Sequence, residues 1–343
     1  MQEKTTSFDI AQLAGVSQPT VSRALRGSKS VSESTRQRIE EIARRLNYKV
    51  DKNASNLRSQ QSHTLALLIF EDPTPDKSLI NPFFLSMLGS ITRTCAVRKY
   101  DLLISFQQES ADWHVDYQDS RKADGLILLG YGDFETYRWR LDRLVEQGAH
   151  FVRWGAVEAG HPGATIGCDN VRGGLDVTRH LLAQGRRRIA FLGAATSGFP
   201  EFRDRWLGYR QALGEIGVDP SPGLRQDAWN TEESGHDAAE ALIYGREAFD
   251  AVVCASDLIA LGALRALQEA GRSVPDDVAV TGFDDILAAG FANPPLTTVA
   301  QDSAAAGELL VSTLLRAIQK LPVDNAMLPA KLVVRRSCGA RVC

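Results

Sequence analysis

The sequence of 343 residues has few cysteines and no long apolar run. The longest apolar run, Leu65 to Phe70, is far too short to cross a bilayer. No charged and then apolar leader precedes a small-residue cleavage site. The cysteines are odd in number and widely spaced, which argues against a disulfide framework and against a zinc site with paired cysteines. They are Cys95, Cys168, Cys254, Cys338 and Cys343. These absences predict a soluble, cytoplasmic protein with reduced thiols and no membrane partner.

The short motifs of common catalytic sites are also missing. Neither the GxxxxGK[ST] of a P-loop nor the GxSxG of a nucleophile elbow occurs. The six histidines show no HExxH or other metal-ligand spacing, and LGAATSG does not match the dinucleotide fingerprint. We therefore expect no enzyme, no metal and no cofactor.

The charge of the chain is unevenly distributed. The net charge is −3, but residues 1 to 62 carry +5 and the remainder carries −8. A basic N-terminal segment on an acidic body favours contact of that segment with a polyanion. The length and the 44% of apolar residues predict roughly two to three domains with sizeable cores.

The stretch FDIAQLAGVSQPTVSRALRG predicts two short helices joined by a tight turn. Thr6 and Asp9 resemble a capping box for a first helix of residues 7 to 14, with Ile10, Leu13 and Ala14 on one face. Gly15 suits a left-handed helix end, and Val16 can fill the small core. Ser17 can cap a second helix that tolerates Pro19 in its first turn.

Two helices joined so closely must cross steeply, as they do in a helix-turn-helix, whose second helix lies in the major groove of DNA. In that helix Val21 and Leu25 face inward. A third helix is expected from Ser32 to about Asn47. Its buried stripe consists of Ile39, Ile42, Ala43 and Leu46. The alternative reading is an ordinary three-helix cap with a solvated polar face.

The same stretch, followed by VSESTRQRIEEIARRLNYKVDKNASNLRS, resembles the headpiece and hinge of the lactose/galactose repressor (LacI/GalR) family of transcriptional regulators. The segments CASDLIALGALRALQEAGRSVPDDVAVTGFDD and PPLTTVAQD are similar to the effector-binding core of that family. The resemblance extends from about Thr6 to Ser337. It implies that the DNA-contacting residues are Thr6, Ser17, Gln18, Pro19, Thr20, Ser22, Arg23, Tyr48, Asn53 and Leu57.

The hinge segment NASNLRS is too short to form a stable helix alone, because isolated helices below about 12 residues are marginal in water. Two copies could become helical on DNA, where Leu57 would form a wedge at a minor-groove base step. A polar linker with one incidental leucine is the alternative from local sequence, and the resemblance favours the wedge. Folding of the hinge can then act as the switched element.

From Thr64 onward, apolar strands alternate with helices, which predicts parallel sheets with right-handed crossovers. The expected strands are residues 65–70, 102–106, 125–129, 151–154, 189–192, 251–254 and 278–281. The expected helices are residues 82–99, 113–120, 135–147, 172–184, 202–213, 231–243 and 258–269.

The expected fold class is α/β. The resemblance implies an all-α helix-turn-helix headpiece at residues 1–50, a hinge at 51–63 and a two-lobed core at 64–343, similar to periplasmic binding proteins and built of doubly wound parallel sheets. Lobe 1 is expected at about 64–160 and 296–322, and lobe 2 at about 163–292 and 326–340. The chain would cross between the lobes three times.

Ligands of open parallel sheets bind at the carboxyl ends of the strands. The polar and aromatic residues that follow the expected strands are Glu71, Asp72, Tyr131, Trp154, Trp229, Ser256, Asp257, Phe283 and Asp284. Carboxylates and an arginine fork can bind sugar hydroxyls, while an aromatic face covers a pyranose. The resemblance implies that Arg205, Trp229 and Asp284 contact the effector, together with Phe83, Asp169, Ser256, Asp257 and Gln301.

Two features leave alternatives open. Ser256, a shorter donor, stands where several family members carry asparagine, which leaves the particular ligand open but not the presence of a site. Asp169 and Asp257 lie at expected helix starts, where either could be an N-cap and not a ligand contact.

Together these features predict a DNA-binding transcriptional regulator, in the repressor class, whose operator affinity responds to a mono- or disaccharide. A homodimer reading a near-palindromic operator is expected. No heptad repeat follows Leu328 that could form a tetramerisation zipper. The sign of the effector response stays open. The rival is a sugar-binding protein of the same fold without a regulatory DNA role.

Overall fold

The structure is a computed structural model that describes residues 5–25, 27–28, 30–48, 61–70, 80–107, 112–130, 134–196 and 198–340. Its internal contacts divide the chain into two units, Met1–Ser62 and His63–Cys343. The expected hinge contacts Asn53 and Leu57 lie outside the described residues, as do Glu71, Asp72 and Tyr131.

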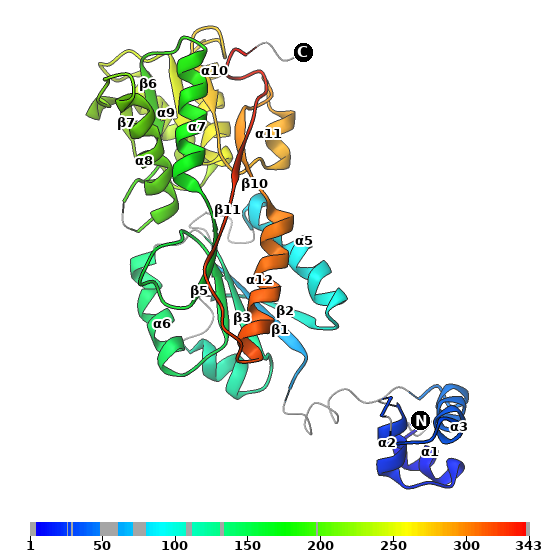
Figure 1. Cartoon of the computed structure of the whole chain (residues 1–343). Helices are drawn as coiled ribbons and strands as arrows, with labels where there is room; N and C mark the ends of the chain where they lie inside the picture. Colours follow the sequence, from blue (N-terminus) through cyan, green and yellow to red (C-terminus); the bar gives the residue numbers. More distant parts are fainter. Residues whose placement is uncertain are drawn as a thin grey trace. The chain divides into compact units, whose positions relative to one another are not determined.

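The first unit contains three helices, α1 (Ser7–Ala14), α2 (Gln18–Leu25) and α3 (Glu33–Arg45) (Figure 1). The expected capping box is present, because the Thr6 backbone N–H donates to Asp9 Oδ2 at 2.7 Å and Asp9 N–H donates back to Thr6 Oγ1. The Thr6 backbone N–H and hydroxyl both donate to the Asp9 carboxylate, and they lower its pKa. Gly15 ends α1 at φ 61°, in the left-handed region.

A small apolar core joins the three helices, with Ile10, Ala14, Val21 and Ile39 among its buried members. The expectation that Leu13 belongs to the buried face of α1 is wrong, since its side chain is 62% exposed. Ala11 is buried instead, because α2 and α3 both pack on the Ile10 side of this two-turn helix.

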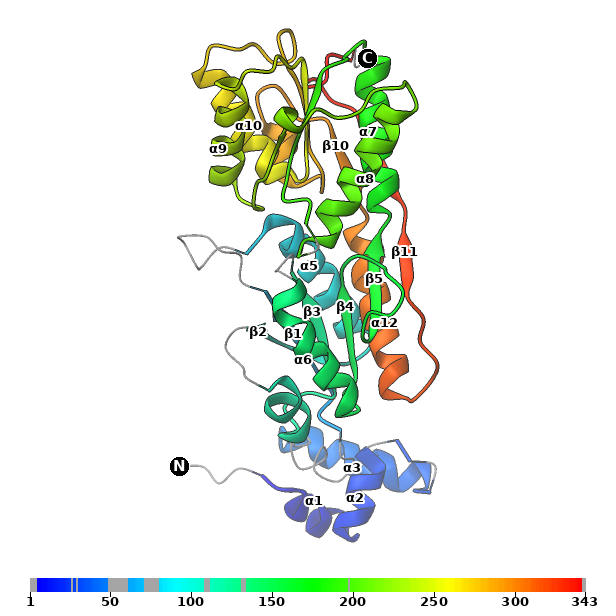
Figure 2. The ribbon, with the colours of Figure 1, turned by 90° about the vertical axis from the view of Figure 1, so that its left-hand side faces the viewer.

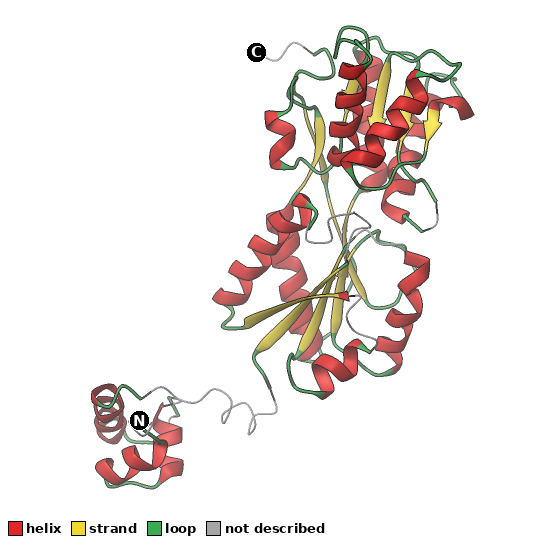
Figure 3. Ribbon diagram, turned by 180° about the vertical axis from the view of Figure 1, so that it is seen from behind, coloured by secondary structure: helices red, strands yellow, loops and turns green. Residues whose placement is uncertain are grey.

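The second unit contains two lobes. The elements of the first lobe are β1 (Thr64–Ile69), β2 (Asp101–Phe106), β3 (Gly125–Leu129), β4 (Phe151–Trp154), β5 (Ala164–Cys168), β11 (Ala326–Leu328), α5 (Pro82–Val97), the π-helix η2 (His114–Asp119), α6 (Phe134–Glu146) and α12 (Ser303–Ile318). Their strands form a parallel sheet in the order β11-β5-β4-β3-β1-β2. Helices α5 and α12 pack on one face of this sheet and η2 and α6 on the other (Figure 3).

The second lobe has a four-stranded parallel sheet in the order β7-β6-β8-β9. Its elements are β6 (Ile189–Leu192), β7 (Arg225–Gln226), β8 (Ala251–Cys254), β9 (Ala279–Thr281), α7 (Asn170–Ala183), α8 (Pro200–Gly214), the 3-10 helix η3 (Pro222–Leu224), α9 (Glu232–Ile243), α10 (Asp257–Glu269) and α11 (Leu287–Phe291). The pair α7 and α8 and the pair α9 and α10 flank the sheet (Figure 2).

Helices α7 and α8 approach one another closely. A Cβ on Gly174 would lie 2.2 Å from the carbonyl oxygen of Arg205, and one on Gly208 would lie 2.1 Å from that of Val171. Only glycine permits this approach. The crossing brings the middle of α8, and with it Arg205, against the first turn of α7.

The chain crosses between the lobes three times. The first crossing follows β5, the second joins β10 (Thr298–Gln301) to α12, and the third joins β11 to β12 (Ala330–Val333). β10 and β12 form an antiparallel pair. The expected lobe boundaries differ from this arrangement, because Ala164–Cys168 and Ala326–Leu328 pair in the sheet of the first lobe, although both were expected in the second.

Candidate functional site

The exposed side of α2 carries the polar residues expected to contact DNA. Ser17, Pro19 and Arg23 are exposed, while Val21 and Ala24 are buried beneath them. This arrangement leaves the Arg23 side chain on the outer surface of the helix.

The neighbouring polar side chains rigidify this surface. Gln18 Nε2 donates to Ser7 Oγ on α1 at 3.2 Å, and the hydroxyl oxygens of Ser17 and Thr20 lie 2.9 Å apart. Tyr48 is partly buried against the core of this unit. The second helix of the pair is therefore held in place by the first.

Arg205 is the central group of the candidate effector site in the second unit. Its side chain is 1% exposed, and its guanidinium lies 3.8 Å from the centre of the Phe283 ring. Nε donates to Asn170 Oδ1 at 2.9 Å, and Nη1 donates to the carbonyl oxygen of Ala255. An arginine held on several sides presents its remaining donors in a fixed direction.

Asp284 and Gln301 complete a buried polar cluster with Arg205. Arg205 Nη2 lies 3.5 Å from Asp284 Oδ1, and Gln301 Nε2 donates to the same oxygen at 2.7 Å. Asp284 has a φ of 112°, a conformation rare for residues other than glycine. Its backbone N–H donates to Val299 O at 2.8 Å, which fixes the turn after β9 against β10.

The aromatic residues expected in the site occur in two pairs, one in each lobe. Phe83 on α5 is buried 5.9 Å from Trp154 at the end of β4. In the second lobe, Trp229 is 51% exposed and meets Phe199 edge to face at 5.0 Å. An exposed indole beside buried donors and acceptors has the chemistry that binds a polyol.

Ser256 and Asp257 form hydrogen bonds within the protein that hold the segments next to the site. Ser256 is the N-cap of α10 and accepts from Ile259 N–H, so the expectation that Asp257 could be the cap is wrong. Asp257 is fully buried and accepts from Ile286 N–H at 2.9 Å and from the Thr298 hydroxyl at 2.5 Å. Burial, with Asp284 nearby, raises the pKa of Asp257 well above its usual value.

Asp169 is an N-cap, since its carboxylate accepts from Arg172 N–H at 2.9 Å at the start of α7. The next residue, Asn170, was missed by the sequence analysis. It is buried, accepts from Arg205, and donates to Cys168 O at 3.1 Å. No strand was expected directly before Asn170, so the search at strand ends could not find it.

A second missed group joins the two lobes. Arg153 in β4 is buried and donates to His161 Nδ1 at 2.8 Å, while His161 Nε2 faces Glu158 at 3.3 Å. Desolvation and Arg153 lower the pKa of His161, which fits a neutral ring accepting at Nδ1. Glu158 also pairs with Arg203 on α8. A charged residue inside the apolar strand FVRW was the available signal.

Glu201 on the first turn of α8 is the buried carboxylate of this contact between lobes. Its Oε1 accepts from Ala156 N–H at 3.0 Å, and burial raises its pKa although Arg153 and Arg205 lie near. Phe134 N–H donates to Gly198 O at 2.9 Å on the same side. The first turn of α8 and its preceding loop therefore hold the second lobe against the first.

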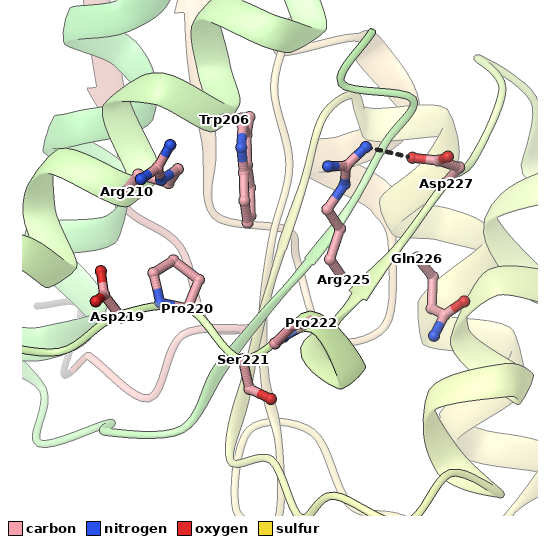
Figure 4. Close-up of a pocket in the computed structure, with 9 residues that line it drawn as sticks. All are labelled: Trp206, Arg210, Asp219, Pro220, Ser221, Pro222, Arg225, Gln226 and Asp227. Atoms are coloured by element: carbon pink, nitrogen blue, oxygen red, sulfur yellow. Dashed lines mark hydrogen bonds and ion pairs between the residues drawn. The ribbon is translucent and has the colours of Figure 1, made fainter.

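A separate groove of about 930 Å³ lies on the second lobe between α8 and β7 (Figure 4). None of the residues predicted for the effector lines it. Its Trp206 ring stacks on Tyr209 at 4.8 Å and has the Arg225 guanidinium 5.3 Å from its centre. Arg225 is in turn paired with Asp227 at 3.0 Å. We do not assign the effector to this groove, because its indole and the Arg225 guanidinium already contact one another and none of the predicted effector contacts lies there.

Within the described part of the chain, none of the helices is both long and apolar enough to span a membrane.

The fold and both sites define a class of protein. The family model of the bacterial regulatory proteins, lacI family, matches residues 8–51, and that of the periplasmic binding protein-like domain matches residues 178–338. The chain is 32% identical to the HTH-type transcriptional repressor CytR of Escherichia coli (strain K12) over 98% of its own length and 96% of the relative. The chain belongs to the LacI family of transcriptional regulators.

Two solved structures extend this result. The lac repressor dimer bound to operator and the anti-inducer ONPF is similar with a TM-score of 0.84 and 26% identity, covering 98% of this chain and 100% of that one. A complex of the transcriptional regulator CelR with cellobiose is similar with a TM-score of 0.72 and 30% identity, covering 97% and 99%. The expected family and fold class are confirmed.

Proposed function

We propose that this regulator is a repressor that binds a near-palindromic DNA operator through its first unit and a mono- or disaccharide through its second. The observation that carries the proposal is the presence in one chain of an exposed polar helix-turn-helix face and a buried Arg205–Asp284–Gln301 cluster. Relatives of similar length include an operator-bound repressor and a cellobiose-bound regulator.

In the DNA-binding unit, we assign base contacts to the exposed side of α2. Arg23 has the donors for a bidentate contact to guanine, and Gln18 and Thr20 have groups that can contact base edges or phosphates. Thr6, Ser17, Pro19, Ser22 and Tyr48 position the unit on the backbone. Asn53 and Leu57 are proposed as the hinge contacts in the minor groove.

In the effector-binding unit, Arg205, Asp284 and Gln301 are proposed to bind sugar hydroxyls. Asp169 lies at the first crossing and joins them as an acceptor. Phe83 and Trp229 cover the apolar face of the ring. Ser256 and Asp257 hold the turn that carries Asp284, so their contribution to effector binding is to position it.

The proposed assembly is a homodimer. Helix α11 exposes Leu287 and Phe291, each 81% accessible, on one short segment of the second lobe. Paired large apolar side chains of this kind are typical of an interface. A two-fold dimer presents two α2 helices to a near-palindromic site. We propose a cytoplasmic location, because the proposed operator is DNA, and no catalytic role is proposed.

Fluorescence anisotropy with labelled genomic fragments, at fixed salt, tests the function. Purified protein should select a fragment containing an inverted repeat, and a sugar should change its affinity by about 5- to 150-fold. The direction of that change shows whether the sugar is an inducer or a corepressor. A protein that binds sugar but does not discriminate between fragments would be a carrier and not a regulator.

A further inference from the structure

Asn230 carries two buried polar atoms that have no hydrogen-bond partner among the described residues. The residue is 9% exposed, and both Oδ1 and Nδ2 are unpaired. Buried polar groups in folded proteins are almost always hydrogen-bonded, because an unmade bond leaves the full cost of desolvation. A ligand that pairs with both atoms of this amide must donate a hydrogen bond to Oδ1 and accept one from Nδ2.

Asn230 also lies at the ligand-binding edge of the second lobe. Gly193 N–H donates to Gln226 O and Ala194 N–H donates to Ala228 O, so residues 226–228 run beside the chain that leaves β6. Residue 230 follows directly, at the carboxyl end of the sheet, where ligands of such sheets bind.

A series of ring contacts connects this position to the Arg205 cluster. Trp229 touches Phe199, whose ring lies 6.2 Å from that of Phe202. The Phe202 ring in turn lies 5.3 Å from the Arg205 guanidinium. The residue before Asn230 is thus connected through two phenylalanine rings to the proposed effector contact Arg205.

The backbone around Asn230 is fixed. Trp229 N–H donates to Ser234 Oγ at 2.9 Å, Thr231 N–H donates to Trp229 O at 2.7 Å, and Thr231 Oγ1 accepts from Ser234 N–H at 3.1 Å. These bonds tie both neighbours of Asn230 to the first turn of α9. The backbone that carries the amide is therefore held in one place before any ligand arrives, which lowers the entropic cost of binding.

We propose that Asn230 determines the specificity of the effector site by binding two neighbouring hydroxyls of the sugar. The inference rests on the proposed function. The amide oxygen accepts from one hydroxyl, and the amide NH2 donates to the next. A sugar without one of these hydroxyls would leave half of the buried amide unpaired, which is a strong basis for rejection.

The test is calorimetric titration of the full chain with D-ribose, D-glucose and cellobiose, repeated with Asn230→Ala and Asn230→Asp. The Ala variant should lose about 10- to 100-fold in affinity for the sugar that binds, and the Asp variant should also lose affinity because it lacks the NH2 donors. Thr196→Ala, also in a loop of the second lobe, serves as a matched control.

Monodeoxy derivatives of the sugar that binds provide the decisive comparison. Removal of one hydroxyl should weaken binding to the wild type but not to Asn230→Ala, because the variant has no amide left to pair. Equal losses in both proteins would overturn the assignment.

The stability of the sugar-free protein supplies an independent readout. Asn230→Ala should leave the melting temperature unchanged or raise it, since it removes unpaired polar atoms. A marked decrease would show that a bound water satisfies the amide in a structural role, and this would overturn the inference. If Asn230→Ala binds sugar as the wild type does, only the inference fails. If none of the three sugars binds the wild type, the proposed effector class fails and the inference fails with it.

Discussion

The two binding regions of this protein differ in how their polar side chains are held. On α2 the candidate contact residues stand on the outer surface, and the core beneath them consists of small apolar side chains. In the second unit, Arg205, Asp284 and Gln301 are buried and bound to one another. A duplex must be met by an accessible surface, whereas a small polyol can be enclosed.

The difference has a consequence for stability. An exposed residue such as Arg23 can be replaced without leaving any buried partner unpaired. Replacement of Arg205 removes the hydrogen bonds that it donates to Asn170 and Ala255 and its ion pair with Asp284. Function and folding are therefore separable in the first unit and linked in the second.

The largest expected effect comes from Arg205→Ala. The change leaves the Asp284 carboxylate buried without its cation, which costs about 3–5 kcal/mol of unfolding free energy. Sugar binding should also be lost. Urea unfolding of the variant measures the first and titration with sugar the second. Arg210→Ala, exposed on the same helix, should change stability by less than about 0.5 kcal/mol. An unfolding free energy equal to that of the wild type would show that the buried cluster is not structural.

A smaller effect, which changes DNA binding but not stability, is expected from Arg23→Ala. Discrimination at one base position of each half-site should fall by about 1–3 kcal/mol, while the melting temperature stays the same. Anisotropy titrations against operators with single substitutions measure this loss. Arg38→Ala, exposed on α3, is the control that removes the same charge. Equal losses on all sequences would make Arg23 a phosphate contact.

Thr6→Ala tests whether the first unit has any stabilising polar contact of its own. The capping box is lost, which costs a helix about 0.5–2 kcal/mol. Hydrogen exchange of the α1 amides should accelerate while exchange in the second unit stays the same. Gln12→Ala, exposed on the same helix, should have no such effect. Unchanged exchange at α1 would show that the cap is dispensable.

The smallest effect is a change in pH dependence produced by Glu201→Gln. Burial raises the pKa of Glu201 in the folded state above its ordinary value of 4.5, so ionisation of this group destabilises the fold as the pH rises. The variant cannot ionise, and its stability relative to the wild type should therefore increase from pH 4.5 upward. Thermal melts across that range measure the difference. Glu308 is exposed on α12, and Glu308→Gln should not change the pH dependence of stability.

The sequence predicted the elements of the first unit well because its signals are local. Thr6 with Asp9, Gly15 and Ser32 mark helix ends through contacts within a few residues. Strands β1 to β4, β6, β8 and β9 were also found, since each is a short continuous run rich in apolar residues. The position of β5 was not, because its pairing with β4 and β11 depends on residues distant in the chain.

The site was harder to predict than the fold. Position relative to strand ends and family resemblance found Arg205 and Asp284, but the buried role of Asp257 depends on its distant partners Ile286 and Thr298. Glu201 was missed for the same reason, because it accepts from the Ala156 N–H of the other lobe. The hydrogen bonds of Arg153 go to nearby residues, Ala156 and His161, and its charge within an apolar strand was a local signal that was not used.

Two of the crossings between lobes begin at proposed effector contacts. Asp169 follows β5 directly, and Gln301 is the last residue of β10, immediately before the cap of α12. If the sugar binds the Gln301 amide as proposed, a shift of that amide moves the start of the segment that carries α12 back to the other lobe. No relay of intervening side chains is then required for occupancy of the site to alter the angle between the lobes.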